Sequence, residues 1–188
     1  MIIYFHGNAN NLKRWGKYSV NFTSLGYDVL MIDYRGYGKS SGIPTEELLY
    51  IDAVTIWKWV KNTFKYPKHI IYGRSLGAAV ASNLAGKTDP DILIMETPFD
   101  NLNRALPAYL IPFKLKYKFR NCRHLPEVNC KKVIFHGTMD MLIPITSAKR
   151  LKPFLNEKDK MIIIEKGRHN NLDSFPIYHE ELQNVLQN

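Results

Sequence analysis

The stretch from Ile70 to Val80 constrains the fold of this chain more strongly than any other. It reads IIYGRSLGAAV, which indicates an apolar strand, a tight turn and a helix of small residues. The turn spells G-x-S-x-G with Ser75 at its centre, and a serine in such a strand-to-helix turn projects its hydroxyl from the edge of a sheet. We therefore predict that Ser75 is a nucleophile. The alternative is that it only caps the following helix, which is a common role of serine.

Strand-like and helix-like patterns alternate along all 188 residues. We predict strands at residues 1–5, 27–32, 68–72, 91–95, 132–135 and 161–165. We predict helices at residues 12–25, 46–64, 76–85, 147–155 and 175–186. Such alternation implies right-handed crossovers and a mainly parallel sheet. Because the strand cores are apolar on both faces, we expect a three-layer α/β/α fold of about six strands, forming a single domain over residues 1–188.

Three chemically capable residues follow different strands of this predicted sheet, and functional residues gather at the carboxyl ends of parallel strands. A serine hydroxyl is a poor nucleophile. It needs a neighbouring base, and the base needs a third group to orient it. Ser75, Asp140 and His169 supply these groups in the order serine, acid, histidine, so we predict a catalytic triad. Glu96, which follows the strand after the serine turn, is the alternative acid.

Five motifs in this order resemble the α/β-hydrolase family over essentially the whole chain. They are FHGNA at 5–9, DYRGYGKSSG at 33–42, GRSLG at 73–77, HGTMD at 136–140 and GRHN at 167–170. Within the family, the chain is most similar to the small serine hydrolases that include palmitoyl-protein thioesterases and their bacterial relatives. The resemblance implies the α/β-hydrolase fold and cleavage of esters or thioesters, in small molecules or acylated proteins, through an acyl-serine intermediate. A catalytically silent binding protein on the same fold is the alternative.

The resemblance also implies an oxyanion hole and an exposed sheet edge. The backbone N–H groups of Asn8 and Leu76 are the expected donors, because preset donors stabilise the negative charge that develops during acyl transfer. Family members usually carry two further strands before the strand that begins here at Met1. Without them, the strand at 27–32 is expected to form an edge of the sheet. An exposed edge predicts association between copies of the chain.

Residues 101–130 interrupt the alternation and are expected to form a short lid-like insertion. Between Arg104 and Lys132 there are eight basic residues and one acid, Glu127, in a chain whose formal net charge is +9. Apolar residues are interleaved with the basic ones: Leu110, Ile111, Phe113, Leu115, Tyr117 and Phe119. One interpretation is a solvated cover with its lysines outward, and another is a lid that touches an anionic membrane surface. We expect no nucleic-acid partner, because no binding module is recognisable.

The sequence predicts neither a cofactor nor a metal, because no cluster of ligand residues has metal-binding spacing. His6 and His136 each precede a glycine and are expected to be structural. The loop at 33–42 lacks a phosphate-binding motif. The chain has only two cysteines, Cys122 and Cys130, and shows neither a signal peptide nor an apolar run of membrane-spanning length. These features favour a reduced, cytoplasmic setting.

Overall fold

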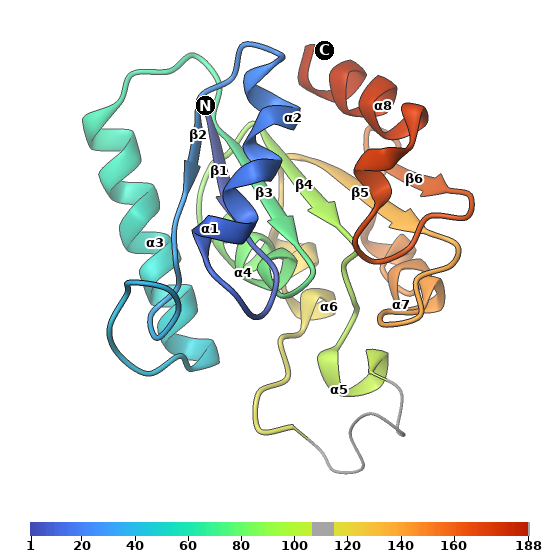
Figure 1. Cartoon of the computed structure of the whole chain (residues 1–188), viewed down its shortest axis with the longest axis horizontal. Helices are drawn as coiled ribbons and strands as arrows, with labels where there is room; N and C mark the ends of the chain where they lie inside the picture. Colours follow the sequence, from blue (N-terminus) through green and yellow to red (C-terminus); the bar gives the residue numbers. More distant parts are fainter. Residues whose placement is uncertain (107–114, 188) are drawn as a thin grey trace.

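The computed structural model describes residues 1–106 and 115–187. Six strands form one sheet in the order β2-β1-β3-β4-β5-β6, and all neighbouring strands are parallel (Figure 1). The strands are β1 Ile2–Phe5, β2 Val29–Met31, β3 Ile70–Arg74, β4 Ile92–Glu96, β5 Lys131–Gly137 and β6 Lys160–Ile164. The predicted parallel sheet is therefore confirmed. The second strand lies at one edge of the sheet, as expected, and the association of copies through this edge stays a prediction.

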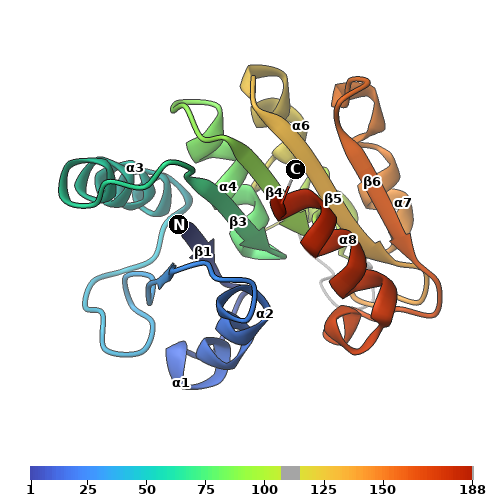
Figure 2. The same cartoon turned by 90° about the horizontal axis from the view of Figure 1, so that it is seen from above.

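Helices cover both faces of the sheet (Figure 2). One face packs against α1 Leu12–Trp15, α2 Val20–Thr23 and α8 Pro176–Gln187. The opposite face packs against α3 Glu46–Thr63, α4 Leu76–Ala85, α6 Asn121–His124 and α7 Ile145–Lys149. The short helix α5, Leu102–Ala105, lies beyond the carboxyl ends of the strands (Figure 1). One 3₁₀ turn, Leu125–Glu127, follows α6, and another, Leu172–Ser174, precedes α8.

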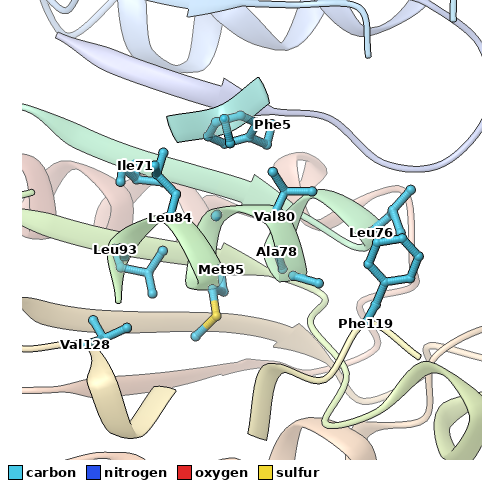
Figure 3. Packing of buried hydrophobic residues seen from close by; sticks show 14 of the residues in the cluster. Phe5, Ile71, Leu76, Ala78, Val80, Leu84, Leu93, Met95, Phe119 and Val128 are labelled. Atoms are coloured by element: carbon cyan, nitrogen blue, oxygen red, sulfur yellow. The ribbon is translucent and has the colours of Figure 1, made fainter. Parts of the chain in front are cut away.

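Side chains alternate between the two faces along each strand, which explains why the strands are apolar throughout. Along β1, Ile3 and Phe5 belong to the cluster under α3 and α4, whereas Ile2 and Tyr4 belong to the cluster under α1, α2 and α8. Figure 3 shows the first cluster, in which α4 lies on the central strands. Every residue of α4 is buried. The helix that follows Ser75 is therefore at the centre of the fold.

Two helices predicted as continuous are broken in the structure. The segment at 12–25 consists of α1, a 3₁₀ turn at Gly16–Ser19 and α2. The first residue of this turn is glycine, which has a low helix propensity. The segment at 147–155 is covered by the end of α7 and a 3₁₀ turn at Lys152–Phe154. This break has a direct cause, because Pro153 has no N–H group to continue an α-helix.

His124, the last residue of α6, joins that helix to α3 and α4. Its Nδ1 accepts a hydrogen bond from the Asn83 amide at 3.3 Å, and its Nε2–H donates to the hydroxyl oxygen of Tyr50 at 3.3 Å. The Tyr50 hydroxyl donates in turn to Glu46 at 3.0 Å. Burial lowers the pKa of His124 to about 4, although the nearby Glu46 opposes this shift. The histidine is therefore neutral in the folded protein at pH 7.

We predict that acid destabilises the fold through His124. Its pKa is lower in the folded state than its ordinary value of 6.5, so the unfolded state binds more protons between that pH and about pH 4. Stability is therefore lost as the pH falls through this window. Urea denaturation of His124→Gln across the window should show a weaker pH dependence than the wild type. The exposed His179 gives the control, His179→Gln, which should keep the wild-type slope; an unchanged slope in His124→Gln would contradict the prediction.

Candidate active site

Ser75 lies at a sharp turn between β3 and α4. Its backbone has φ +53° and ψ −114°, a conformation that non-glycine residues rarely adopt. The side chain makes no capping hydrogen bond to α4, although Ser75 occupies the N-cap position. The two glycines of the motif are required by close packing. A Cβ at Gly77 would lie 2.0 Å from the carbonyl oxygen of Phe5, and one at Gly73 would lie 2.4 Å from that of Gly77.

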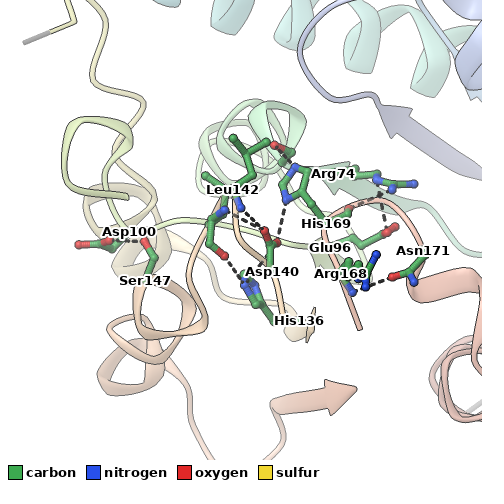
Figure 4. A network of polar contacts seen from close by, with 12 residues as sticks. Arg74, Glu96, Asp100, His136, Asp140, Leu142, Ser147, Arg168, His169 and Asn171 are labelled. Carbon is green, nitrogen blue, oxygen red and sulfur yellow. Dashed lines mark hydrogen bonds and ion pairs between the residues drawn. The ribbon is translucent and has the colours of Figure 1, made fainter. Parts of the chain in front are cut away.

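The structure brings the three predicted triad residues together, and Figure 4 shows His169 beside Asp140. The hydroxyl oxygen of Ser75 lies 3.1 Å from Nε2 of His169, and Nδ1 of His169 lies 2.7 Å from Oδ2 of Asp140. Because an ionised carboxylate only accepts hydrogen bonds, Nδ1 carries the proton, and Nε2 is left to accept the Ser75 O–H. The three residues follow β3, β5 and β6, which end at the same edge of the sheet. This geometry allows His169 to take the serine proton.

Asp140 is held in place by its own loop. Its Oδ1 accepts the backbone N–H groups of Leu142 at 3.0 Å and Ile143 at 2.8 Å, which leaves Oδ2 for His169. His136 lies behind it, with Nε2 3.7 Å from Oδ2 of Asp140 and 2.9 Å from the carbonyl oxygen of Ile143. Burial lowers the pKa of His136, so its ring is neutral and its Nε2–H donates to that carbonyl. His136 therefore has the structural position that the sequence predicted.

Glu96, the alternative acid, is paired elsewhere. Its Oε1 lies 3.3 Å from Nε of Arg74, and the hydroxyl of Tyr72 donates a hydrogen bond to Oε2. Its side chain is almost completely buried, so these partners compensate a charge that would otherwise be costly to remove from water. The imidazole of His169 is bonded to Asp140 instead. The geometry therefore favours Asp140 over Glu96 as the acid.

The expected oxyanion-hole residues lie beside Ser75. Asn8 and Leu76 both line the same cavity as Ser75. Leu76 is the first residue of α4, and the first N–H groups of a helix have no acceptor within it. The loop that carries Asn8 is tied to the next loop, because the hydroxyl of Tyr37 donates to the Asn8 side chain at 2.6 Å. Both backbone N–H groups are thus on elements that border the nucleophile.

A cavity of about 490 Å³ opens next to Ser75. Its walls are mainly apolar and come from separate parts of the chain: Leu49 of α3, Phe99 after β4, Leu102 of α5 and Ile143 after β5. Pockets with apolar walls and a few placed polar groups are typical of small-molecule sites. The cavity therefore has room for an apolar group held close to the serine hydroxyl. Sequence reasoning did not predict these four wall residues, because they meet only through the tertiary fold.

The described part of the basic insertion covers this cavity. Leu115, Tyr117 and Phe119 line it, whereas Lys116 and Lys118 between them are exposed. The segment has no regular secondary structure, and along it the partly buried or buried residues Leu115, Tyr117 and Phe119 alternate with the exposed lysines. This is the arrangement expected of a lid with apolar residues inward and lysines outward. The predicted lid residues Leu110, Ile111, Phe113 and Lys114 lie outside the described residues.

This covering segment is anchored at two points. The carboxylate of Glu46, in the first turn of α3, accepts the backbone N–H groups of Lys118 at 2.8 Å and Phe119 at 3.0 Å. The side chain of Asn103 accepts the N–H of Leu115 at 2.7 Å and donates to its carbonyl oxygen at 3.2 Å. The segment is not part of a helix or strand, so these side-chain bonds take the place of secondary-structure hydrogen bonds for its backbone. They hold residues 115–119 over the cavity.

Two other residues considered from the sequence are structural. His6 is buried, burial lowers its pKa, and its Nδ1–H donates to the carbonyl of Gly7 at 2.7 Å. Lys132, counted with the basic insertion, is buried near the start of β5 and pairs with Asp159 at 3.0 Å. The expectation that the lysines of this stretch point outward is therefore wrong for Lys132. It contributes no charge to the surface.

Within residues 1–106 and 115–187, no group of three or more His, Cys, Asp or Glu side chains is arranged to hold a metal ion. Cys122 and Cys130 are free thiols. Across the same described ranges, no helix combines the length and apolar character needed to cross a membrane.

Comparison with known proteins decides the family. A protein-family model described as alpha/beta hydrolase fold matches residues 1–95. This chain belongs to the α/β-hydrolase family. Lysophosphatidylserine lipase ABHD12 of Danio rerio is 31% identical to it over 179 aligned residues, covering 80% of this chain and 46% of that protein. Protein ABHD12B of Homo sapiens is 29% identical over 204 residues, covering 92% of this chain and 56% of that protein. The chain spans about half the length of these curated relatives.

Solved structures share the α/β-hydrolase fold of this chain. An esterase from Pyrococcus furiosus has a TM-score of 0.81 at 19% identity, with coverage of 99% of this chain and 80% of that chain. A monoacylglycerol lipase from Paleococcus ferrophilus has a TM-score of 0.73 at 14% identity, with coverage of 98% and 91%. At these identities the similarity shows the fold alone. The predicted family and fold are confirmed.

We predict that Asp140→Asn lowers kcat for a soluble nitrophenyl ester by about 10⁴-fold, because an amide in this position orients the imidazole in the wrong tautomer. Glu96→Gln serves as the comparison, and it should have a much smaller effect on kcat under conditions where the variant is folded. Circular dichroism establishes folding for both. A larger loss of kcat in Glu96→Gln than in Asp140→Asn would make Glu96 the acid.

Proposed function

We propose that this protein is a serine hydrolase that cleaves carboxylic ester bonds through an acyl-Ser75 intermediate. The observation that carries the proposal is the hydrogen-bonded series from Ser75 through His169 to Asp140, with distances of 3.1 and 2.7 Å. The strained turn at Ser75 and the cavity beside it support the same conclusion. A silent binding protein would not require a base in hydrogen-bond contact with a serine at a strained turn, so the geometry favours an enzyme.

The proposed mechanism gives each group a role. Nε2 of His169 accepts the Ser75 proton as Oγ attacks the carbonyl carbon, and Asp140 stabilises the imidazolium that forms. The backbone N–H groups of Asn8 and Leu76 donate to the oxyanion of the tetrahedral intermediate. His169 then gives its proton to the departing alcohol, which leaves the acyl group on Ser75. Water attacks this ester with His169 again as base, and His169 returns the proton to Oγ of Ser75 as the carboxylic acid is released.

The apolar cavity supports an ester with an extended apolar acyl chain as the substrate. Its volume of about 490 Å³ and its leucine and phenylalanine walls suit hydrocarbon better than a charged group. Similar proteins are named lysophosphatidylserine lipase, esterase and monoacylglycerol lipase, names that refer to ester substrates. Thioesters are the second substrate class, since the same attack on a carbonyl carbon releases a thiol. We propose carboxylic esters as the first substrate class because the names of these similar proteins refer to ester substrates.

The test is a panel of nitrophenyl esters and acyl thioesters of rising chain length, assayed with the wild type and Ser75→Ala. We expect kcat/KM to rise with chain length until the acyl chain fills the cavity, because each methylene buried from water contributes about 0.8 kcal/mol. A fluorophosphonate probe should label the wild type at Ser75. Hydrolysis or labelling that persists in Ser75→Ala would refute the assignment of the nucleophile.

We also propose that the covering segment contacts an anionic membrane surface. Lys116 and Lys118 are exposed on the outer side of the segment whose inner side lines the cavity. A lysine close to an anionic leaflet contributes about 1 kcal/mol, and this attraction is screened by salt. Such a contact would bring lipid esters to the cavity without requiring a membrane-spanning helix.

Binding to phosphatidylserine vesicles should therefore weaken as the salt concentration rises, and a Lys116→Gln, Lys118→Gln double variant should bind more weakly at low salt. The matched control is Lys58→Gln with Lys65→Gln, which removes the same charge from exposed positions on and after the far end of α3. A soluble short-chain ester should be hydrolysed equally by all three proteins. Equal vesicle binding by the two double variants would show that the lysines of the covering segment have no special role.

A further inference from the structure

Arg74, the residue before Ser75, is a charged side chain inside the protein, with only 1% of its surface exposed. A buried guanidinium requires a compensating partner, because transfer of an unpaired charge from water is costly. Glu96 supplies it, with Oε1 3.3 Å from Nε of Arg74. The two residues are directly opposite each other on the neighbouring strands β3 and β4. The sheet register therefore creates this ion pair one residue away from the nucleophile.

The other end of the same guanidinium reaches the loop that carries the base. Nη2 of Arg74 donates to the backbone carbonyl oxygen of His169 at 3.1 Å and to Oδ1 of Asn170 at 3.3 Å. Figure 4 shows Arg74 between Glu96 and this loop. Arginine is suited to this position, because its planar group has five donors in a rigid fork, whereas lysine has one compact ammonium.

Aromatic and tyrosine side chains hold the pair in place. The guanidinium lies 4.5 Å from the ring centroid of Tyr18 and 5.4 Å from that of Trp15, distances typical of cation–π contacts. On the other side, the hydroxyl of Tyr72 donates to Glu96. Burial, together with the charge of Glu96, raises the pKa of Tyr72 well above its ordinary value, so this hydroxyl remains a donor. The pair is thus restrained from both sides.

We propose that Arg74, held by Glu96, is a positioning residue for His169. Because Arg74 and Ser75 are consecutive in the chain, the bond from Arg74 to the His169 carbonyl ties the base to the same backbone that carries the nucleophile. Catalytic groups act only within about 0.5 Å of their productive placement, and a displacement of about 1 Å can cost roughly 100-fold in rate. The bond from Arg74 supplies this precision to the loop of His169, which follows the edge strand β6. The inference rests on the proposed function.

The experiment uses variants that separate positioning from stability. Arg74→Met removes the guanidinium donors. The double variant Arg74→Met with Glu96→Gln removes both buried charges, and the amide oxygen at position 96 can still accept the hydrogen bond from Tyr72. Arg74→Lys keeps a positive charge for Glu96 without the fork that also reaches the His169 loop. Arg168→Met is the matched control, since Arg168 precedes His169 and its side chain is exposed. Each protein is assayed for kcat and KM with a soluble nitrophenyl ester and for its urea midpoint.

We expect Arg74→Met to lose stability and the double variant to regain most of it, because the unpaired buried carboxylate has been removed. The kcat of both, and of Arg74→Lys, should stay about 10- to 100-fold below wild type with KM nearly unchanged, since the cavity is untouched. The ¹H NMR resonance of the proton between His169 and Asp140 should broaden or shift in these variants. Arg168→Met should match the wild type in every measurement.

Recovery of kcat together with stability in the double variant, or wild-type kcat in Arg74→Lys, would show that the ion pair only stabilises the fold. An unchanged His169–Asp140 proton resonance in the folded variants would also overturn the inference. The wild type and Ser75→Ala separate this failure from failure of the proposed function. If the wild type has no turnover that depends on Ser75, the proposed function is wrong, and the NMR measurement still tests the position of His169.

Discussion

The close packing of α4 against the central strands is the constraint on which the rest of the structure depends. Gly77 approaches the carbonyl of Phe5 so closely that no side chain could fit between them, and all ten residues of α4 are buried. A helix that lies this close to β1 and β3 can be reached from β3 only by a sharp turn. Ser75 occupies that turn at φ +53°, a backbone strain worth about 1–3 kcal/mol that the surrounding packing must offset. The packing of the core therefore fixes the position of Ser75, the proposed nucleophile.

Buried carboxylates around the site each have defined partners, and these partners decide which carboxylate remains for His169. Glu96 faces Arg74 and Tyr72, whereas Asp140 accepts two backbone N–H groups through one oxygen and keeps the other for the imidazole. The division of roles between two acids that both follow strands is thus a consequence of their hydrogen-bond partners.

Glu46 shows how one side chain can link the core to the cover of the site. It lies in the first turn of α3, where a carboxylate is stabilised by the helix dipole. Its carboxylate also accepts two backbone N–H groups from the segment that closes the cavity. The segment that covers the cavity is therefore coupled to the helix that packs on the sheet.

Local patterns were enough to predict the succession of strands and helices along the chain and the parallel sheet, because periodicity and turn chemistry are properties of neighbouring residues. They also selected Ser75, Asp140 and His169 as candidates, and the fold places these three side chains in hydrogen-bond contact. They failed where distant groups decide the outcome. Lys132, expected to point outward, is buried and pairs with Asp159. The walls of the cavity and the bond from Arg74 to the loop of His169 likewise join residues far apart in the chain. The sequence determined which residues could do chemistry, and only the tertiary structure decided which of them meet, since hydrogen-bond partners and buried charges are chosen by the fold.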